Sequence, residues 1–134
     1  MILELFFDLS FLHTNERFDL ILIHDMIHDS TDPLSILKCA HARLSDSGSC
    51  IIVDTKGEDT QEAKLKSPLA PLFFAFSMTM CLPSSMSEPN GAALGTMAMG
   101  PETGMKLLRE AGFGNIRVEY SEQLPINIIF VAKK

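Results

Sequence analysis

Residues 18–33, FDLILIHDMIHDSTDP, indicate the fold more directly than any other part of this sequence. Leu20 to Ile23 is an uninterrupted run of leucine and isoleucine, which is typical of a parallel strand buried on both faces. The run ends in four titratable residues, His24, Asp25, His28 and Asp29. Asp32-Pro33 then predicts a helix start, with aspartate as the N-cap and proline in the first helical position. Open α/β sheets bind ligands where a buried strand ends in this way beside a helix.

A second buried strand is predicted after this helix, at Cys50 to Val53. In the intervening helix, the residues that recur at helical spacing should face the core. They are Leu34, Leu37, His41 and Leu44. Ser45 to Gly48 is expected to end that helix. Strand, helix and strand over 18–54 predict a right-handed βαβ crossover. Because parallel neighbours end at the same edge of a sheet, we expect Asp25 and Asp54 to share one groove.

We assign the whole chain, 1–134, to a single domain made of consecutive segments. Residues 1–17 form an N-terminal segment ahead of the βαβ unit, and 55–100 are predicted to hold a helix at 68–82 and a lid-like loop at 84–100. Residues 101–134 predict a helix over 101–111 and an antiparallel hairpin. Gly112 stands at the C-cap position of that helix.

Composition and charge narrow the class of function. The chain has 134 residues, 46% of them hydrophobic, and a net charge of −6. This charge disfavours binding to nucleic acid or anionic membranes, which both need basic patches. The longest apolar stretch, 68–83, is too short to span a membrane. Three cysteines form no CxxC pair, so we expect free thiols and a cytoplasmic protein.

Four motifs in order resemble the class I S-adenosylmethionine-dependent methyltransferases. FDLILIHD (18–25) resembles the fourth strand of that family, and 26–33 the segment after it. Leu44 to Asp54 resembles the L-x-P-G-G turn and fifth strand, with Asp46 and Ser47 in place of Pro and the first Gly. LLREAGF (107–113) resembles the LL-x-x-AGF helix end, and 116–132 the last hairpin. The resemblance implies an α/β fold: a partial Rossmann-like sheet, with parallel strands and a C-terminal antiparallel hairpin, flanked by helices on both faces.

The resemblance also implies a function, methyl transfer from S-adenosylmethionine to a small-molecule substrate. On this reading His28 is the catalytic base. The cofactor would contact His24, Asp25 and Met26, together with Asp8 and Leu9 near the start of the chain, and the substrate would contact Asp54, Phe73 and Ser77. The family's Gly-x-Gly-x-Gly loop is missing from the sequence. We therefore expect a truncated form in which cofactor binding is incomplete.

Two other interpretations stay open at this stage. A catalytically dead, shortened isoform would act as a binding or dimerisation module. Without the family's first strand, the edge of 20–23 would be exposed, so either the apolar segment 2–7 covers it or the chain forms a homodimer there. A metal-dependent hydrolase would use His24, Asp25 and His28, whose spacing is similar to the HExxH zinc motif. That motif needs a helix, and His24 ends a strand-like run, so we expect no metal site.

Overall fold

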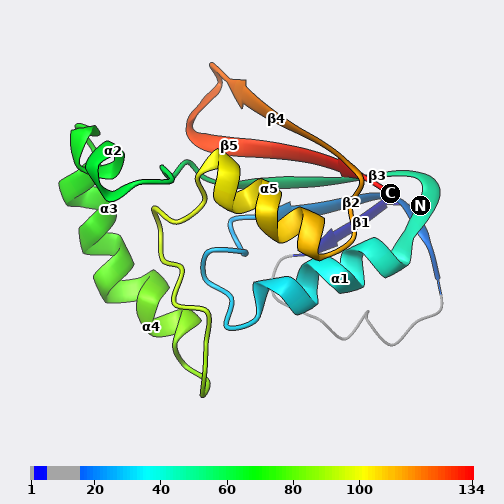
Figure 1. Ribbon diagram of the computed structural model, residues 1–134, viewed down its shortest axis with the longest axis horizontal. Helices are drawn as coiled ribbons and strands as arrows, with labels where there is room; N and C mark the ends of the chain where they lie inside the picture. Colours follow the sequence, from blue (N-terminus) through cyan, green and yellow to red (C-terminus); the bar gives the residue numbers. More distant parts are fainter. Residues whose placement is uncertain (1, 6–15) are drawn as a thin grey trace.

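The computed structural model describes residues 2–5 and 16–134, which build one five-stranded sheet in the order β1-β2-β3-β5-β4. Strands β1 (Ile2–Leu5), β2 (Phe18–His24) and β3 (Leu44–Thr55) are parallel. Strand β5 (Leu124–Lys133) runs antiparallel to both β3 and β4 (Asn115–Ser121) (Figure 1). The predicted parallel pair and C-terminal hairpin are confirmed.

Strand β1 pairs with the edge of β2 that would be exposed without the family's first strand. Its register runs from Ile2 opposite Leu20 to Leu5 opposite Ile23. The expectation that the N-terminal segment covers this edge is therefore confirmed for residues 2–5. Residues 6 and 7 of the expected segment, and the predicted cofactor contacts Asp8 and Leu9, lie outside the described residues.

Helix α1 (Pro33–Arg43) begins where the sequence predicted. The Asp32 side chain accepts a hydrogen bond from the Ser35 backbone N–H at 3.0 Å, as an N-cap does. The inward face is rotated from the predicted one and consists of Pro33, Ile36, Leu37 and Ala40. Leu44 is fully buried, but as the first residue of β3. The prediction that 45–48 ends the helix was wrong, because the backbone is already extended at Leu44 and the strand starts there.

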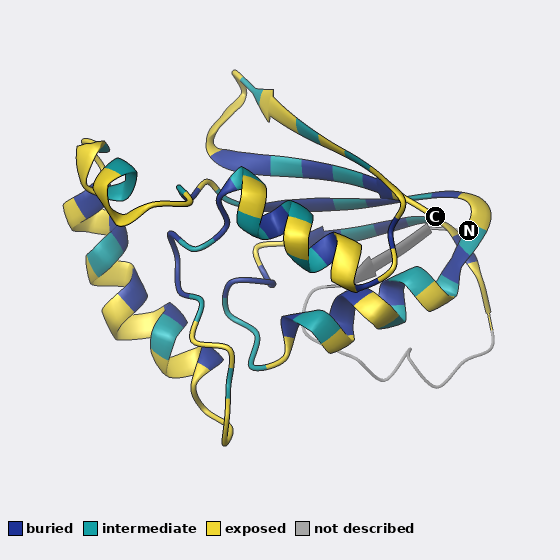
Figure 2. Cartoon of the chain, viewed as in Figure 1, coloured by how far each residue is buried: buried dark blue, intermediate teal, exposed yellow. Residues whose placement is uncertain are grey.

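The core lies between one face of the sheet and two helices, α1 and α5 (Pro101–Glu110) (Figure 2). Two rows of side chains across the strands supply the sheet side of this core: Ile21, Cys50 and Ala132, then Ile23, Ile52 and Phe130. The expectation of helices on both faces is not met by the described residues, because α1 and α5 contact each other on the same face. The opposite row of apolar residues is only half-buried and includes Leu22, Ile51 and Val131.

The predicted helix at 68–82 is present as three consecutive pieces. Helix α3 (Ala70–Phe76) passes into a π-helical turn, η2 (Ser77–Cys81), and then into the short α4 (Leu82–Ser85). Helix α2 (Gln61–Lys66) precedes them, and this helical arm lies beyond the carboxyl ends of the strands (Figure 1). Its buried side includes Phe73, Ser77 and Cys81, which are spaced four residues apart.

Two further features of the described chain complete the fold. Gly112 has φ +107°, and the Phe113 N–H donates to the Leu108 carbonyl at 3.1 Å, so the predicted C-terminal glycine of α5 is confirmed. Cys39, Cys50 and Cys81 are free thiols. Among the described residues, no helix has both the length and the apolar character needed to cross a bilayer.

Candidate functional site

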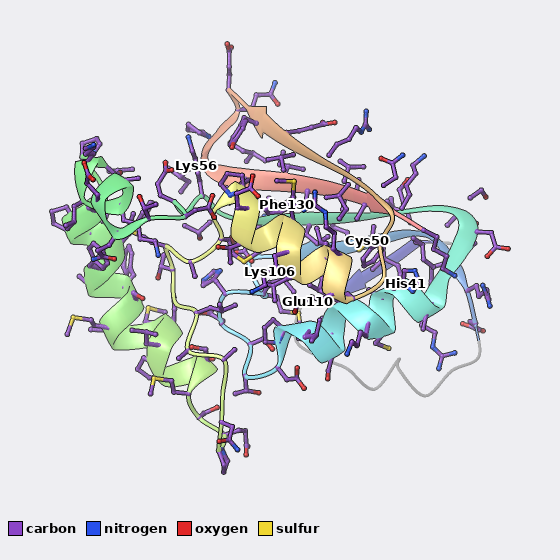
Figure 3. The ribbon with its side chains drawn as sticks, in the orientation of Figure 1. His41, Cys50, Lys56, Lys106, Glu110 and Phe130 are labelled. Atoms are coloured by element: carbon purple, nitrogen blue, oxygen red, sulfur yellow. The ribbon has the colours of Figure 1, made fainter. Side chains whose placement is uncertain are left out.

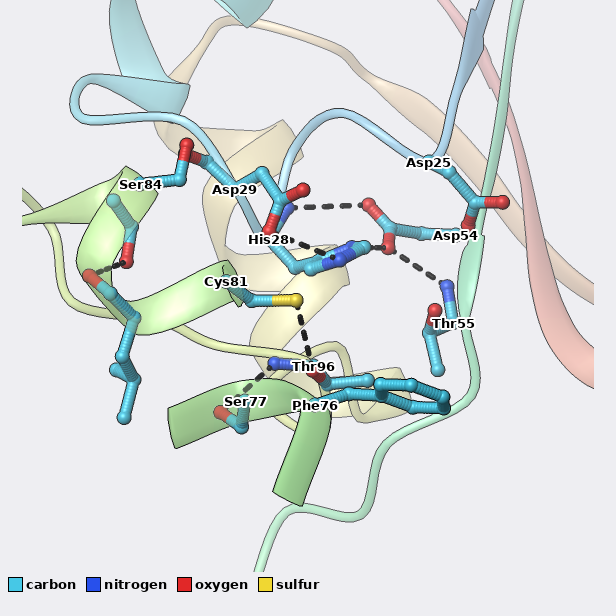
Figure 4. Close-up of polar contacts among 12 residues, drawn as sticks. Asp25, His28, Asp29, Asp54, Thr55, Phe76, Ser77, Cys81, Ser84 and Thr96 are labelled. Carbon is cyan, nitrogen blue, oxygen red and sulfur yellow. Dashed lines mark hydrogen bonds and ion pairs between the residues drawn. The ribbon is translucent and has the colours of Figure 1, made fainter. Parts of the chain in front are cut away.

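A buried histidine–aspartate pair lies at the carboxyl ends of two neighbouring parallel strands. Strand β2 ends at His24, and Asp54 is the second-last residue of β3, so the two strands finish at the same edge. The loop after β2 carries His28 over Asp54, and the His28 Nδ1 is hydrogen-bonded to an Asp54 carboxylate oxygen (Figure 4). The His28 backbone N–H donates to the other oxygen at 3.3 Å. The side chains are 6% and 0% exposed.

The loop takes this path because of the conformation of Asp25. Its φ is +45°, a left-handed conformation that aspartate adopts more readily than most residues. Its N–H still donates to the Val53 carbonyl at 2.9 Å, so the chain leaves β2 while remaining attached to β3. Carboxylate oxygens of Asp25 and Asp54 and a ring nitrogen of His28 all lie within 4.8 Å of one another. The prediction that the two aspartates lie together at one edge of the sheet is thus confirmed.

The electrostatics of His28 are set by opposing effects. Burial lowers the pKa of its imidazole, whereas the hydrogen bond to Asp54 and the charges of Asp54, Asp29 and Asp25 raise it. The net effect raises the His28 pKa above its usual value. The site therefore stabilises a proton on this histidine more than water does.

The second ring nitrogen of His28 faces Asp29. Its Nε2 lies 3.3 Å from the Asp29 Oδ1. That oxygen is buried and accepts no well-aligned hydrogen bond, although the side chain as a whole is 32% exposed. A buried acceptor without a donor is costly, so this oxygen is a place where a proton, a ligand group or a cation would be stabilised.

Sequence reasoning did not identify Cys81 as part of the site. The Thr96 hydroxyl donates to the Cys81 Sγ at 2.9 Å, and the Thr96 backbone N–H donates to the Ser77 Oγ at 3.3 Å. The Cys81 Sγ also lies within 4.8 Å of ligand atoms of His28 and Asp29. Burial raises the pKa of the Cys81 thiol to about 11. No local pattern could have identified this contact, because it depends on how the helical arm packs over the strand ends.

A cavity of about 210 Å³ opens beside the histidine loop and is rich in hydroxyl groups. It is lined by Met26, Asp29, Ser30, Thr31, Ile36, Ser84 and Ser87. The Ser84 hydroxyl donates to the Asp29 carbonyl at 3.0 Å, which links the helical arm to the loop. Since complete ligand sites usually exceed ~300 Å³, this cavity suits part of a small molecule.

The other predicted site residues are placed as follows. His24 is exposed at the rim with its Nδ1 3.7 Å from an Asp25 oxygen, whereas Met26 is buried and lines the cavity. Phe73 lines a different cavity of about 190 Å³, next to Lys56 and Ile126. Ser77 is buried against Thr96, as described above. The structure brings His28, Asp25 and Asp54 together, and the ligand contacts assigned to these residues remain predictions.

The alternative metal set of His24, Asp25 and His28 is not brought together in the described residues. His24 belongs to strand β2, so the helix that an HExxH-like motif needs does not form here. Groups able to hold a metal ion in the described chain contain His28 with Asp29 and Cys81, or with Asp25 and Asp54, but not His24.

Comparisons with known proteins identify the fold. Protein-family models give no match, and curated protein sequences give none either. Solved structures do match. PigF with SAH has a TM-score of 0.64 and 20% identity, over 87% of this chain and 30% of PigF. This chain has the fold of the C-terminal part of a class I S-adenosylmethionine-dependent methyltransferase.

Two further methyltransferases show the same likeness. A putative O-methyltransferase from Nostoc punctiforme matches with a TM-score of 0.62 and 21% identity, over 90% of this chain and 33% of that protein. Human N-acetylserotonin methyltransferase in complex with SAM matches with a TM-score of 0.61 and 18% identity, over 87% and 29%. The chain thus spans about a third of the length of these methyltransferases.

Proposed function

We propose that this chain supplies the acceptor-activating part of an S-adenosylmethionine-dependent methyltransferase that methylates a hydroxyl group of a small molecule. The observation that carries the proposal is the buried His28–Asp54 pair at the carboxyl ends of β2 and β3, beside a cavity whose lining mixes apolar residues with serine and threonine. The choice of oxygen as acceptor is supported by the similarity to a putative O-methyltransferase.

The role of His28 is that of a general base. Asp54 accepts the hydrogen bond from Nδ1–H and so holds the tautomer in which Nε2 has a free lone pair. An acceptor hydroxyl at Nε2 would pass its proton to that nitrogen as its oxygen attacks the methyl group, and the methyl–sulfur bond would break to leave the neutral thioether. The imidazolium that forms is stabilised by the carboxylates of Asp54 and Asp29. General-base assistance of this kind contributes about 10²- to 10⁴-fold in rate.

The described residues fit one wall of a cofactor site. S-adenosylmethionine would supply an activated methyl group on a positively charged sulfur. Carboxylates of Asp25, Asp29 and Asp54 surround His28, and their negative charge suits a cationic donor. His24, Asp25 and Met26 are the residues that we assign to this wall. In residues 2–5 and 16–134, no glycine-rich turn follows a strand, so we assign no residue here to the methionine carboxylate or the ribose.

The proposal is tested by measuring methyl transfer from S-adenosylmethionine to a panel of hydroxylated aromatic compounds, with product detected by mass spectrometry. His28→Gln should lower the turnover rate by about 10²- to 10⁴-fold. His41→Gln is the matched control, because His41 packs against the Phe113 ring, 5.0 Å between centroids, on helix α1. Equal turnover in the two variants would refute the role of His28. Absence both of turnover and of calorimetric binding of S-adenosylhomocysteine would favour the binding-module interpretation.

The homodimer expected from an exposed strand edge remains a prediction. The edge of β2 is paired with β1, so a dimer through the sheet would use an outer edge, either β1 or β4. Size-exclusion chromatography of the purified chain tests this, and a monomer at high concentration would remove it.

A further inference from the structure

Two electron-pair acceptors face each other at the centre of the site. Because the Nδ1–H of neutral His28 is directed to Asp54, its Nε2 presents a lone pair. The Asp29 Oδ1 lies 3.3 Å away, is buried, and receives no hydrogen bond. A positive centre between these two atoms, either a proton or a metal cation, would stabilise both.

We propose that His28, Asp29 and Cys81 form a binding site for a thiophilic divalent cation of the zinc type. The inference goes beyond the proposed methyl transfer and does not depend on it. The three ligand atoms come from the loop after β2 and from the π-helical turn η2, and all lie within 4.8 Å of one another.

The spacing of the nitrogen and oxygen atoms suits tetrahedral zinc. Zinc binds histidine nitrogen and carboxylate oxygen at about 2.0–2.2 Å, so two such ligands at tetrahedral corners lie about 3.4 Å apart. The separation of His28 Nε2 and Asp29 Oδ1 is 3.3 Å. A sulfur ligand would lie about 3.6 Å from that nitrogen. The Cys81 sulfur lies on the same side of the site as the His28 ring (Figure 4), within 4.8 Å of ligand atoms of His28 and Asp29.

The metal ligands are also held in place by hydrogen bonds to neighbouring residues, as metal ligands usually are. Asp54 accepts the hydrogen bond from the His28 Nδ1, which fixes the ring orientation and makes Nε2 a better donor of electrons. The Thr96 hydroxyl donates to the Cys81 Sγ at 2.9 Å and orients the sulfur. Three protein ligands would leave the fourth position for water, as in open zinc sites.

The competing set of Asp25, His28 and Asp54 is less suitable. Its carboxylates could hold a hard cation such as Mg²⁺, but Asp54 already occupies Nδ1 of the shared histidine. The sulfur of Cys81 favours zinc over magnesium or calcium. On binding, the Cys81 thiol releases its proton to solvent and the thiolate joins the metal. The cation then occupies Nε2, so a metal-loaded site has no free base.

The test is a titration of the full chain with Co²⁺, followed by visible absorption. Wild-type protein should give the tetrahedral cobalt bands together with a thiolate-to-cobalt charge-transfer band, and Zn²⁺ should displace both. Cys81→Ser should lose the charge-transfer band and bind Co²⁺ at least tenfold more weakly. Cys39→Ser is the matched control and should keep the band, because Cys39 lies on helix α1.

Several results would overturn the assignment: no charge-transfer band in the wild type, a band that survives in Cys81→Ser, or a band that is lost in Cys39→Ser. Thermal melts without metal establish that each variant is folded. Asp29→Asn should weaken Co²⁺ binding while Asp25→Asn should not, and the reverse order would assign the cation to the competing set. Because the readout is spectroscopic, the result is separate from methyl transfer.

Discussion

Gly104 on helix α5 provides a quantitative test of the packing between this helix and the sheet. A Cβ at this position would lie 2.1 Å from the Phe130 Cζ and 2.5 Å and 2.8 Å from the two Cε atoms. Phe130 is fully buried, and α5 crosses directly over it (Figure 3). The close approach of helix and sheet therefore requires a residue without a side chain.

Gly104→Ala should destabilise the fold although alanine favours helices. At an exposed helical position this change raises the free energy of unfolding by about 1 kcal/mol. Here the new contact is far shorter than the ~3.5–4.0 Å optimum between carbon atoms, and the ring is enclosed by the core. Overpacking typically costs about 1–3 kcal/mol. Because the overlap exceeds an ångström, we expect a net loss of about 1–2 kcal/mol.

The measurement is urea denaturation followed by circular dichroism, with the slope of the transition compared between proteins. The partner variant is Phe130→Leu, which removes the ring. In that background Gly104→Ala should become neutral or stabilising, because only the helix preference remains. Wild-type stability in Gly104→Ala, or the same loss in both backgrounds, would refute the reasoning.

Two more predictions concern charged groups. The Asp59 carboxylate accepts hydrogen bonds from the backbone N–H groups of Glu102 and Thr103 at 3.1 and 2.9 Å, so Asp59→Ala should cost about 1–2 kcal/mol in urea unfolding. Glu58→Ala is its control, and equal losses would contradict the capping role. Because the pKa of His28 is raised in the folded protein, protonated His28 stabilises the fold. This contribution is complete below the unfolded-state pKa of about 6.5 and is lost as pH rises through the folded-state pKa. The difference in Tm between wild type and His28→Gln should therefore shrink on going to alkaline pH. A difference that grows instead would show that folding lowers the His28 pKa.

Local signals in the sequence determined the elements that depend on local chemistry. The apolar run of β2, the Asp32-Pro33 helix start and the Gly112 helix end were all predicted, since each reflects a preference of a few neighbouring residues. The inward face of α1 and the broken helix at 70–85 were not. Both depend on which surface the packed sheet and arm present to the helix, and periodicity alone does not report this.

The same distinction holds for the site. The strand pattern alone placed Asp25 and Asp54 at one edge, because parallel strands joined by a helix must end on the same side, and the family resemblance added His28. Only the tertiary structure decided that Cys81 meets His28 and Asp29. That meeting depends on the helical arm folding back over the strand ends, a long-range packing arrangement that no short sequence pattern encodes.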